Sequence, residues 1–213
     1  MITNDTYQKL LQGNQDFIDR ISQQDPQFFE KLSQAQTPKV LWIGCADSRV
    51  PANQITSTLP GEIFVHRNVA NVVVHTDMNF LTVLEYAVTV LKVEHVIVCG
   101  HYGCGGVLAA MGQDHYGVID NWLRHIKDVY RMHREELDSI EDQDQKGRRF
   151  VELNVLEQVL NVCKTSTIQK AWEETQLPHV HGWVYDIANG KIQDLNCNVA
   201  NHQELASIYK FDF

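Results

Sequence analysis

The sequence predicts an α/β fold: a largely parallel central β-sheet flanked by helices, with an N-terminal helical arm. Short apolar runs alternate with longer amphipathic stretches, which is the pattern of strands joined by crossover helices. Of the 213 residues, 44% are hydrophobic and 21% are charged, an ordinary globular composition that excludes a disordered or fibrous chain. The length suits one domain with an appendage and is sufficient to bury a core.

The first part of the chain predicts two helices. Large apolar residues recur at roughly helical spacing over 4–22, and the segment 27–34 (QFFEKLSQ) is typical of a second, shorter helix. Apolar side chains on a helical arm need a surface to pack on. We therefore expect residues 1–35 to form an N-terminal helical arm that packs on a partner subunit, and residues 36–213 to form the main α/β domain.

Five segments predict strands. Three are short apolar runs typical of buried parallel strands, namely 39–44 (KVLWIG), 62–67 (EIFVHR) and 94–100 (EHVIVCG). The other two, 179–187 and 191–195, are separated by an Ala-Asn-Gly turn.

Helices are expected between these strands. Their ranges are 77–92, 107–111, 117–136 and 150–175. Asp77 is a candidate N-cap for the first of them. The polar stretch 141–149 (EDQDQKGRR) is expected to be a solvated loop.

Composition also limits the function. With 18 basic and 27 acidic side chains the net charge is −9, which argues against nucleic acid as the main partner. No apolar run approaches the roughly 20 residues that span a bilayer, and the polar start lacks a signal-peptide core. We therefore expect a cytoplasmic protein. The five cysteines are odd in number and irregularly spaced, so a disulfide scaffold is not expected.

Two polar segments directly follow predicted strands. Cys45, Asp47 and Arg49 come after 39–44, and His101 and Cys104 come after 94–100. Sites in open α/β sheets form at the carboxyl ends of strands, so the two segments are expected to meet. Cys104 also precedes a predicted helix, whose dipole favours a thiolate. Two sulfurs, an imidazole and a carboxylate are a suitable tetrahedral set for Zn²⁺.

Simpler interpretations exist for each half of this pattern. A single cysteine after a strand is usually a small buried residue, and a single His-x-x-Cys is weak evidence for a metal. The conjunction of both segments at one sheet edge favours zinc. A redox-active or nucleophilic cysteine is the next interpretation.

Four segments carry a family resemblance. The sequences CADSRVP (45–51), FVHRNVAN (64–71), LEYAV (84–88) and VIVCGHYGCGG (96–106) resemble those of the β-class carbonic anhydrases. The match is in register over 36–195 and extends to the bicarbonate-regulated subgroup whose site can close. Ala46, where many members have serine, is a departure outside the ligand positions.

The resemblance implies a catalytic zinc domain over 36–213, with one Zn²⁺ per chain held by Cys45, His101 and Cys104. It implies reversible hydration of CO2 to bicarbonate and a proton by zinc-bound hydroxide, in a homodimer or homotetramer. Asp47 and Arg49 would form a catalytic pair. We expect Asp47 to switch between zinc, where it blocks water at lower pH, and Arg49, where it opens the site at higher pH.

The resemblance also implies two binding sites near the zinc. For CO2, the implied residues are Gln36, Phe64, Val69, Tyr86 and Gly105. By residue type alone, the apolar members of this set are ordinary core residues.

The second implied site is a regulatory bicarbonate pocket formed by Trp42, Arg67 and Tyr185. An arginine with indole and phenol donors suits a small anion. The alternative is that the two aromatic residues simply pack, with Arg67 stacked between them.

Two other functions stay open. One is a related zinc lyase or hydrolase that acts on carbon disulfide or carbonyl sulfide, because the loops around the pocket would decide the substrate. The other is a non-catalytic zinc sensor domain, in which Asp47 never leaves the metal.

Overall fold

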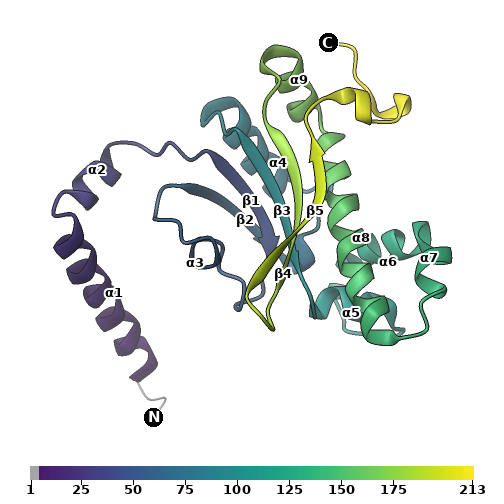
Figure 1. Ribbon diagram of the computed structural model, residues 1–213, viewed down its shortest axis with the longest axis horizontal. Helices are drawn as coiled ribbons and strands as arrows, with labels where there is room; N and C mark the ends of the chain where they lie inside the picture. Colours follow the sequence, from purple (N-terminus) through teal and green to yellow (C-terminus); the bar gives the residue numbers. More distant parts are fainter. Residues whose placement is uncertain (1–4) are drawn as a thin grey trace. The chain divides into compact units, whose positions relative to one another are not determined.

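The structure is a computed structural model that describes residues 5–213. Its centre is a five-stranded sheet in the order β2-β1-β3-β4-β5 (Figure 1). The strands are β1 (Val40–Cys45), β2 (Ile63–Asn68), β3 (His95–His101), β4 (His179–Asp186) and β5 (Lys191–Val199). The first four run parallel, and β5 is antiparallel to β4. The predicted α/β fold with a largely parallel sheet is confirmed.

The contacts divide the chain into two compact units, with the boundary between Thr37 and Pro38. The first unit contains α1 (Asp5–Gln24) and α2 (Phe28–Gln34), as the sequence predicts. Phe29 joins them through an edge-on contact with Phe17 at a centroid distance of 6.0 Å. The role of this unit as an arm for a partner subunit stays a prediction.

Alternation along the strands separates two apolar clusters. The large cluster contains Leu41 and Ile43 of β1 together with helical residues such as Phe150. The small cluster, on the other face of the sheet, contains Trp42 and Cys99. A parallel sheet buried on both faces produces continuous apolar runs in the sequence, which is why the strands could be predicted within a few residues.

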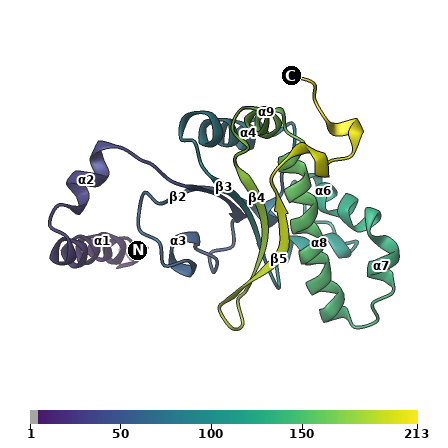
Figure 2. The same ribbon diagram turned by 45° about the horizontal axis from the view of Figure 1, so that its top comes forward.

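Six helices of the second unit cover the side of the large cluster (Figure 2). They are α4 (Met78–Glu85), α5 (Gly105–Met111), α6 (Ile119–Met132), α7 (Arg134–Asp138), α8 (Gln143–Cys163) and α9 (Ser166–Thr175). Helix α3 (Ala52–Ile55) lies on the other face of the sheet, where Ala52 belongs to the small cluster. The short turns are η1 (Val69–Asn71), η2 (Tyr86–Val90), η3 (His202–Glu204) and η4 (Ser207–Tyr209). Asp77 caps α4 as predicted, by accepting a hydrogen bond from the Asn79 backbone N–H. The π-helical turn η2 continues α4, so the expected helix over 77–92 is present in two parts.

The predicted loop over 141–149 is wrong. Helix α8 begins at Gln143, and the Asp142 side chain caps it by accepting from the Gln145 N–H at 2.8 Å. The segment is polar and has no apolar stripe, and its contacts are made with distant residues: Arg148 pairs with Asp186 of β4 at 3.2 Å. Local hydrophobicity therefore could not reveal this turn of helix.

Helix α8 lies against β3 and β4. A Cβ atom added at Gly100 would approach the Val155 side chain to 2.6 Å, and one at Gly182 would approach the same residue to 3.2 Å. The absent side chains at these two glycines allow the helix to pack closely on the sheet. Within residues 5–213, no helix is both long and apolar enough to span a membrane.

Candidate metal centre

The strand ends bring three metal-ligating side chains together. Cys45 is the last residue of β1, His101 is the last residue of the neighbouring β3, and Cys104 directly precedes α5. Their ligand atoms all lie within 4.8 Å of one another, and all three residues are buried. All five cysteines are within the described residues and are free, as expected for a chain without disulfides.

The geometry of this cluster fits a zinc ion. The two Sγ atoms are 3.9 Å apart, close to the edge of about 3.8 Å that a tetrahedron with Zn–S distances of about 2.3 Å requires. His101 Nδ1 must donate its proton to the Tyr102 carbonyl, 3.1 Å away, because a carbonyl only accepts. The lone pair is then on Nε2, which is buried without a hydrogen-bond partner among the described residues. An orphaned buried acceptor beside two sulfurs is what a metal ligand requires.

The two cysteine side chains are joined by a hydrogen bond between their Sγ atoms. The hydrogen bond from Cys104 lowers the pKa of Cys45, and the same contact raises the pKa of Cys104. Cys45 Sγ also accepts from the Ala70 N–H at 3.4 Å. Burial opposes a charge on His101, but the nearby Cys45 sulfur raises the pKa of the imidazole overall. The cluster is therefore prepared to carry negative charge, which a divalent cation would neutralise.

The Ala70 donor depends on residues that the sequence analysis did not single out. Ala70 has a left-handed φ of 62°, a strained conformation for a residue with a Cβ. Asn154 of α8, itself buried, donates to the Ala70 carbonyl at 3.1 Å. The nearby Gln158 accepts from the Val73 N–H at 2.8 Å. Polar residues in the middle of a buried helix are the signal that could have identified them.

Asp47 lies beside the cluster but is held by Arg49. The guanidinium donates through Nε to Oδ1 at 2.9 Å and through its terminal nitrogen to Oδ2 at 2.7 Å. The Arg49 backbone N–H donates to Oδ1 as well, at 2.9 Å. These donors hold the pKa of Asp47 well below its usual value. Asp47 Oδ2 is 3.6 Å from His101 Nε2, so the carboxylate lies next to the metal position without sharing the cluster.

The three proposed regulatory residues share one face of the sheet. Trp42 is buried, and its indole lies against the backbone of Gly44. A Cβ atom added at Gly44 would be only 2.4 Å from the indole Nε1. In the register, Gly44 pairs with Arg67 of β2, while Tyr185 pairs with His101. Arg67 donates to the carbonyls of Cys45 and Asp47 at 2.8 and 2.6 Å.

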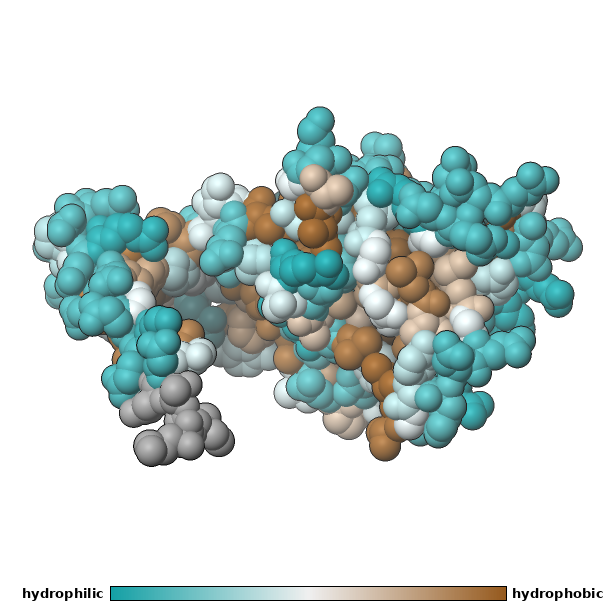
Figure 3. Space-filling view, turned by 90° about the horizontal axis from the view of Figure 1, so that it is seen from below, coloured by the Kyte–Doolittle hydropathy of each residue, from teal (hydrophilic) through white to brown (hydrophobic). Residues whose placement is uncertain are grey.

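The residues expected to bind CO2 fall into separate groups. Phe64 and Tyr86 are in contact, with ring centroids 5.8 Å apart. Val69 and Gly105 line a cavity of about 500 Å³, and Gln36 belongs to the first unit. Figure 3 views the molecule from below, the side toward which β1 and β3 end in Figure 1. It shows apolar residues at the surface of the second unit between hydrophilic ones.

Comparison with known proteins agrees with this geometry. The family model described as "Carbonic anhydrase" matches residues 40–192. A carbonic anhydrase of Emericella nidulans is 49% identical over 191 residues, which cover 90% of this chain and 84% of that protein. One of Candida albicans is 35% identical over 207 residues, covering 96% and 73%.

Solved structures give the same result. One chain comes from crystal structures of two tetrameric β-carbonic anhydrases of Sordaria macrospora. Its sequence is 42% identical, its TM-score is 0.88, and the match covers 92% of this chain and all of that chain. A Coccomyxa β-carbonic anhydrase in complex with acetazolamide is 36% identical with a TM-score of 0.89, covering 95% and 90%. Shared sequence, shared fold and the Cys-His-Cys cluster thus lead to one conclusion: the chain belongs to the β-class carbonic anhydrases, which hydrate CO2 reversibly to bicarbonate.

Proposed function

We propose that this enzyme works with one zinc ion per chain, held by Cys45, His101 and Cys104, and that Asp47 and Arg49 control access to it. The observation that carries the proposal is the buried, unpartnered Nε2 of His101 beside two sulfurs 3.9 Å apart. When bound, zinc supplies a Lewis acid that lowers the pKa of a water molecule and so provides hydroxide for addition to CO2.

The protein side chains orient the reactants. With both carboxylate oxygens fixed by Arg49, Asp47 can accept a hydrogen bond from a water next to the cluster and aim its lone pair at CO2. The low pKa of Asp47 makes it a poor proton acceptor. The released proton therefore leaves through other groups or through buffer.

Asp47 also has a second proposed partner. Its Oδ2 is 3.6 Å from the ligand nitrogen of His101, so a small rotation away from Arg49 would carry the carboxylate onto the ion. Carboxylate and hydroxide are both monoanions and compete for the same position. Because Arg49 keeps the pKa of Asp47 low, Asp47 stays charged near neutral pH, and the hydroxide concentration decides the competition.

The pH dependence of turnover tests this arrangement. We expect the rate of CO2 hydration to rise several-fold between about pH 6.5 and about pH 9, because Asp47 would compete less well with hydroxide for the ion as pH increases. Stopped-flow hydration together with zinc analysis of the same samples gives the measurement. A rate that is flat across this range contradicts the switch. Bound zinc with no hydration at either pH would indicate a sensor domain, and activity on carbon disulfide alone would indicate the related lyase.

For CO2 itself we propose that Phe64, Val69 and Tyr86 provide apolar walls and that Gly105 provides a hydrogen-bond donor, while the role of Gln36 stays a prediction from the sequence. A small apolar molecule needs apolar walls and few polar contacts. The contact between the Phe64 and Tyr86 rings and the cavity beside Val69 and Gly105 support these assignments.

We also propose that bicarbonate binds beside Trp42, Arg67 and Tyr185 and stabilises the closed state, as in the regulated subgroup. Trp42 Nε1 is buried and has no hydrogen-bond partner among the described residues, which an anion would satisfy. Arg67 uses two donors on backbone carbonyls, and its other guanidinium N–H groups can serve an anion. One of the two carbonyls belongs to Asp47, so binding here would act on the segment that carries the switch.

The test of this site removes one donor at a time. Trp42→Phe and Tyr185→Phe are expected to weaken inhibition by bicarbonate at lower pH about tenfold each, since each loses a hydrogen bond to a charged group. Tyr209→Phe is the matched control, because it removes the hydroxyl of an exposed tyrosine on η4. If bicarbonate inhibits the Trp42 and Tyr185 variants as strongly as the control, the proposal is wrong.

The assembly follows from the same comparison. The Sordaria macrospora relatives are described as tetrameric, and α1 of this chain exposes Tyr7, Leu10 and Leu11. We propose a homodimer or homotetramer in which residues 1–35 pack on a partner subunit.

A further inference from the structure

The opposite end of the sheet carries a second cluster of metal-ligating side chains. His95 is the first residue of β3, and His179 is the first residue of β4. The register pairs His95 with His179, and His181 follows two residues later on the same face of β4. We propose that His95, His179 and His181 form a second metal site, which takes a divalent transition metal such as Cu²⁺, Ni²⁺ or Zn²⁺.

The ring geometry is close to that of a chelate. His95 Nδ1 and His181 Nε2 are 3.0 Å apart. Metal–nitrogen distances of about 2.0–2.1 Å require ligand nitrogens about 2.9 Å apart for square-planar coordination and about 3.3 Å apart for tetrahedral coordination. The observed separation lies between these values. A metal could therefore replace the hydrogen bond with little change in the nitrogen–nitrogen distance, once the two rings turn so that both lone pairs point to the ion.

His179 supplies the third ligand. Its ring is stacked on that of His181 at an angle of 12° and a centroid distance of 6.3 Å, and it lies 5.9 Å from His95. Its Nδ1 forms a hydrogen bond with Asn198 Oδ1 at 3.3 Å, a long contact that costs little to give up. Two histidines separated by one residue on a strand project to the same side, so a rotation of this ring brings a third nitrogen to the pair.

The charges around the cluster favour a cation. Burial and the two neighbouring imidazoles lower the pKa of His181, and the nearby Asp194 only partly opposes this shift. The ring is therefore neutral near pH 7, the form that binds metals. Glu94, next to His95, is paired with Lys39 at 2.6 Å and so is already neutralised. Asp194 of β5 remains as the negative charge that faces the site from the adjacent strand.

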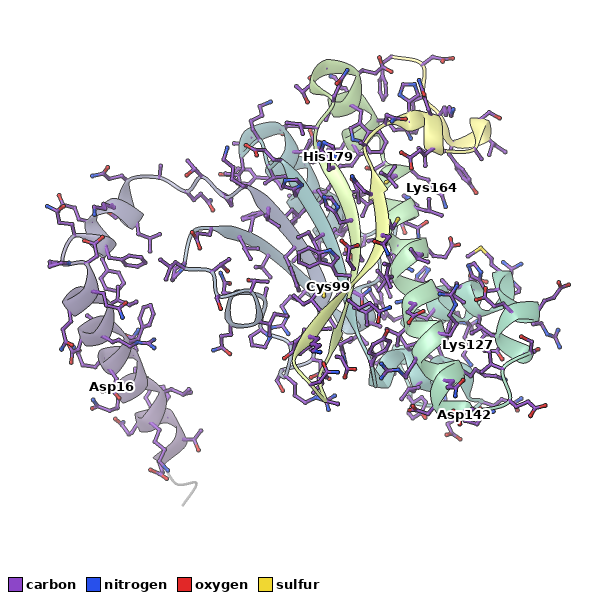
Figure 4. All side chains as sticks on the ribbon, viewed as in Figure 1. Asp16, Cys99, Lys127, Asp142, Lys164 and His179 are labelled. Atoms are coloured by element: carbon purple, nitrogen blue, oxygen red, sulfur yellow. The ribbon has the colours of Figure 1, made fainter. Side chains whose placement is uncertain are left out.

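The cluster is separate from the catalytic centre. His95 and His101 are at opposite ends of β3, about 20 Å apart along an extended strand. Figure 4 shows His179 at the end of the sheet near α9, with Cys99 between it and the end from which α5 departs. The three rings are partly exposed, so a metal ion has access. The two sites can thus be filled and measured independently.

The experiment uses the zinc-loaded enzyme, with zinc retention confirmed by elemental analysis. Titration with Cu²⁺ by calorimetry is expected to give one additional copper per chain, and its electron paramagnetic resonance spectrum should show splitting from several imidazole nitrogens. His181→Ala and His95→Ala are expected to weaken this binding at least tenfold. His125→Ala, at an exposed position on α6, is the matched control and should bind copper like the parent enzyme.

His181→Gln provides a larger polar replacement if alanine disturbs the sheet, and circular dichroism together with retained CO2 hydration reports folding. The proposal is overturned if the parent enzyme takes up no copper beyond its zinc. It is equally overturned if the folded His95 and His181 variants bind copper as tightly as the His125 control.

Discussion

Replacement of Cys104 by serine is expected to abolish both tight zinc binding and CO2 hydration. Serine is nearly isosteric, but its hydroxyl remains protonated and is a poor ligand for zinc, whereas the thiol ionises when the metal binds. Loss of an outer hydrogen-bond partner of a metal ligand already costs about 10–100-fold in metal affinity or activity. Loss of a ligand should therefore exceed about 100-fold in kcat/KM.

Zinc content by elemental analysis and stopped-flow hydration measure this effect. Cys197→Ser is the matched control, since Cys197 is a half-buried cysteine of β5 outside the cluster. The control should retain zinc and activity. A Cys104→Ser enzyme that keeps one zinc per chain and normal turnover would contradict the proposed ligand set.

Removal of the Arg49 side chain is expected to lower kcat/KM about 10–100-fold while zinc stays bound. Arg49 holds Asp47 through two side-chain hydrogen bonds of 2.9 and 2.7 Å. Without them the free carboxylate moves to the ion, and the pKa of Asp47 rises toward its ordinary value. The loss should be largest at lower pH, where hydroxide competes least.

Steady-state hydration of Arg49→Ala across the pH range measures this effect. Arg49→Lys, which keeps the charge but not the paired donors, should recover only part of the activity. Arg131→Ala removes a different exposed arginine, which pairs with Asp128 at 3.3 Å, and should behave like the parent enzyme. An Arg49→Ala enzyme with an unchanged pH profile would leave the pair as an ordinary surface ion pair.

The sequence indicated the metal cluster because its motifs follow strands that are buried on both faces. The run at 39–44 and the run at 94–100 correspond to β1 and β3 within one residue at each end. Carboxyl ends of adjacent parallel strands share an edge, so Cys45 and His101 had to be near each other once these strands were neighbours. Local pattern and spacing were sufficient for this part of the site.

Other parts depend on contacts between distant segments. The Ala70 N–H donates to Cys45, and Asn154, from a helix far along the chain, binds the carbonyl of the same left-handed residue. The first turns of α8 lack an apolar stripe, so their helical state could not be read locally. The pairing of His95 with His181 requires the register of β3 with β4, which no local pattern encodes.

The amino-acid sequence by itself determined the sheet, most helices and the chemical identity of the Cys-His-Cys cluster, because burial periodicity and ligand chemistry are local properties. Tertiary structure alone decided that Asp47 Oδ2 lies 3.6 Å from the ligand nitrogen of His101. It also decided that three histidines meet at the far end of the sheet. The physical reason is that hydrogen-bond geometry and strand register depend on how separate segments pack, and packing is a property of the whole fold.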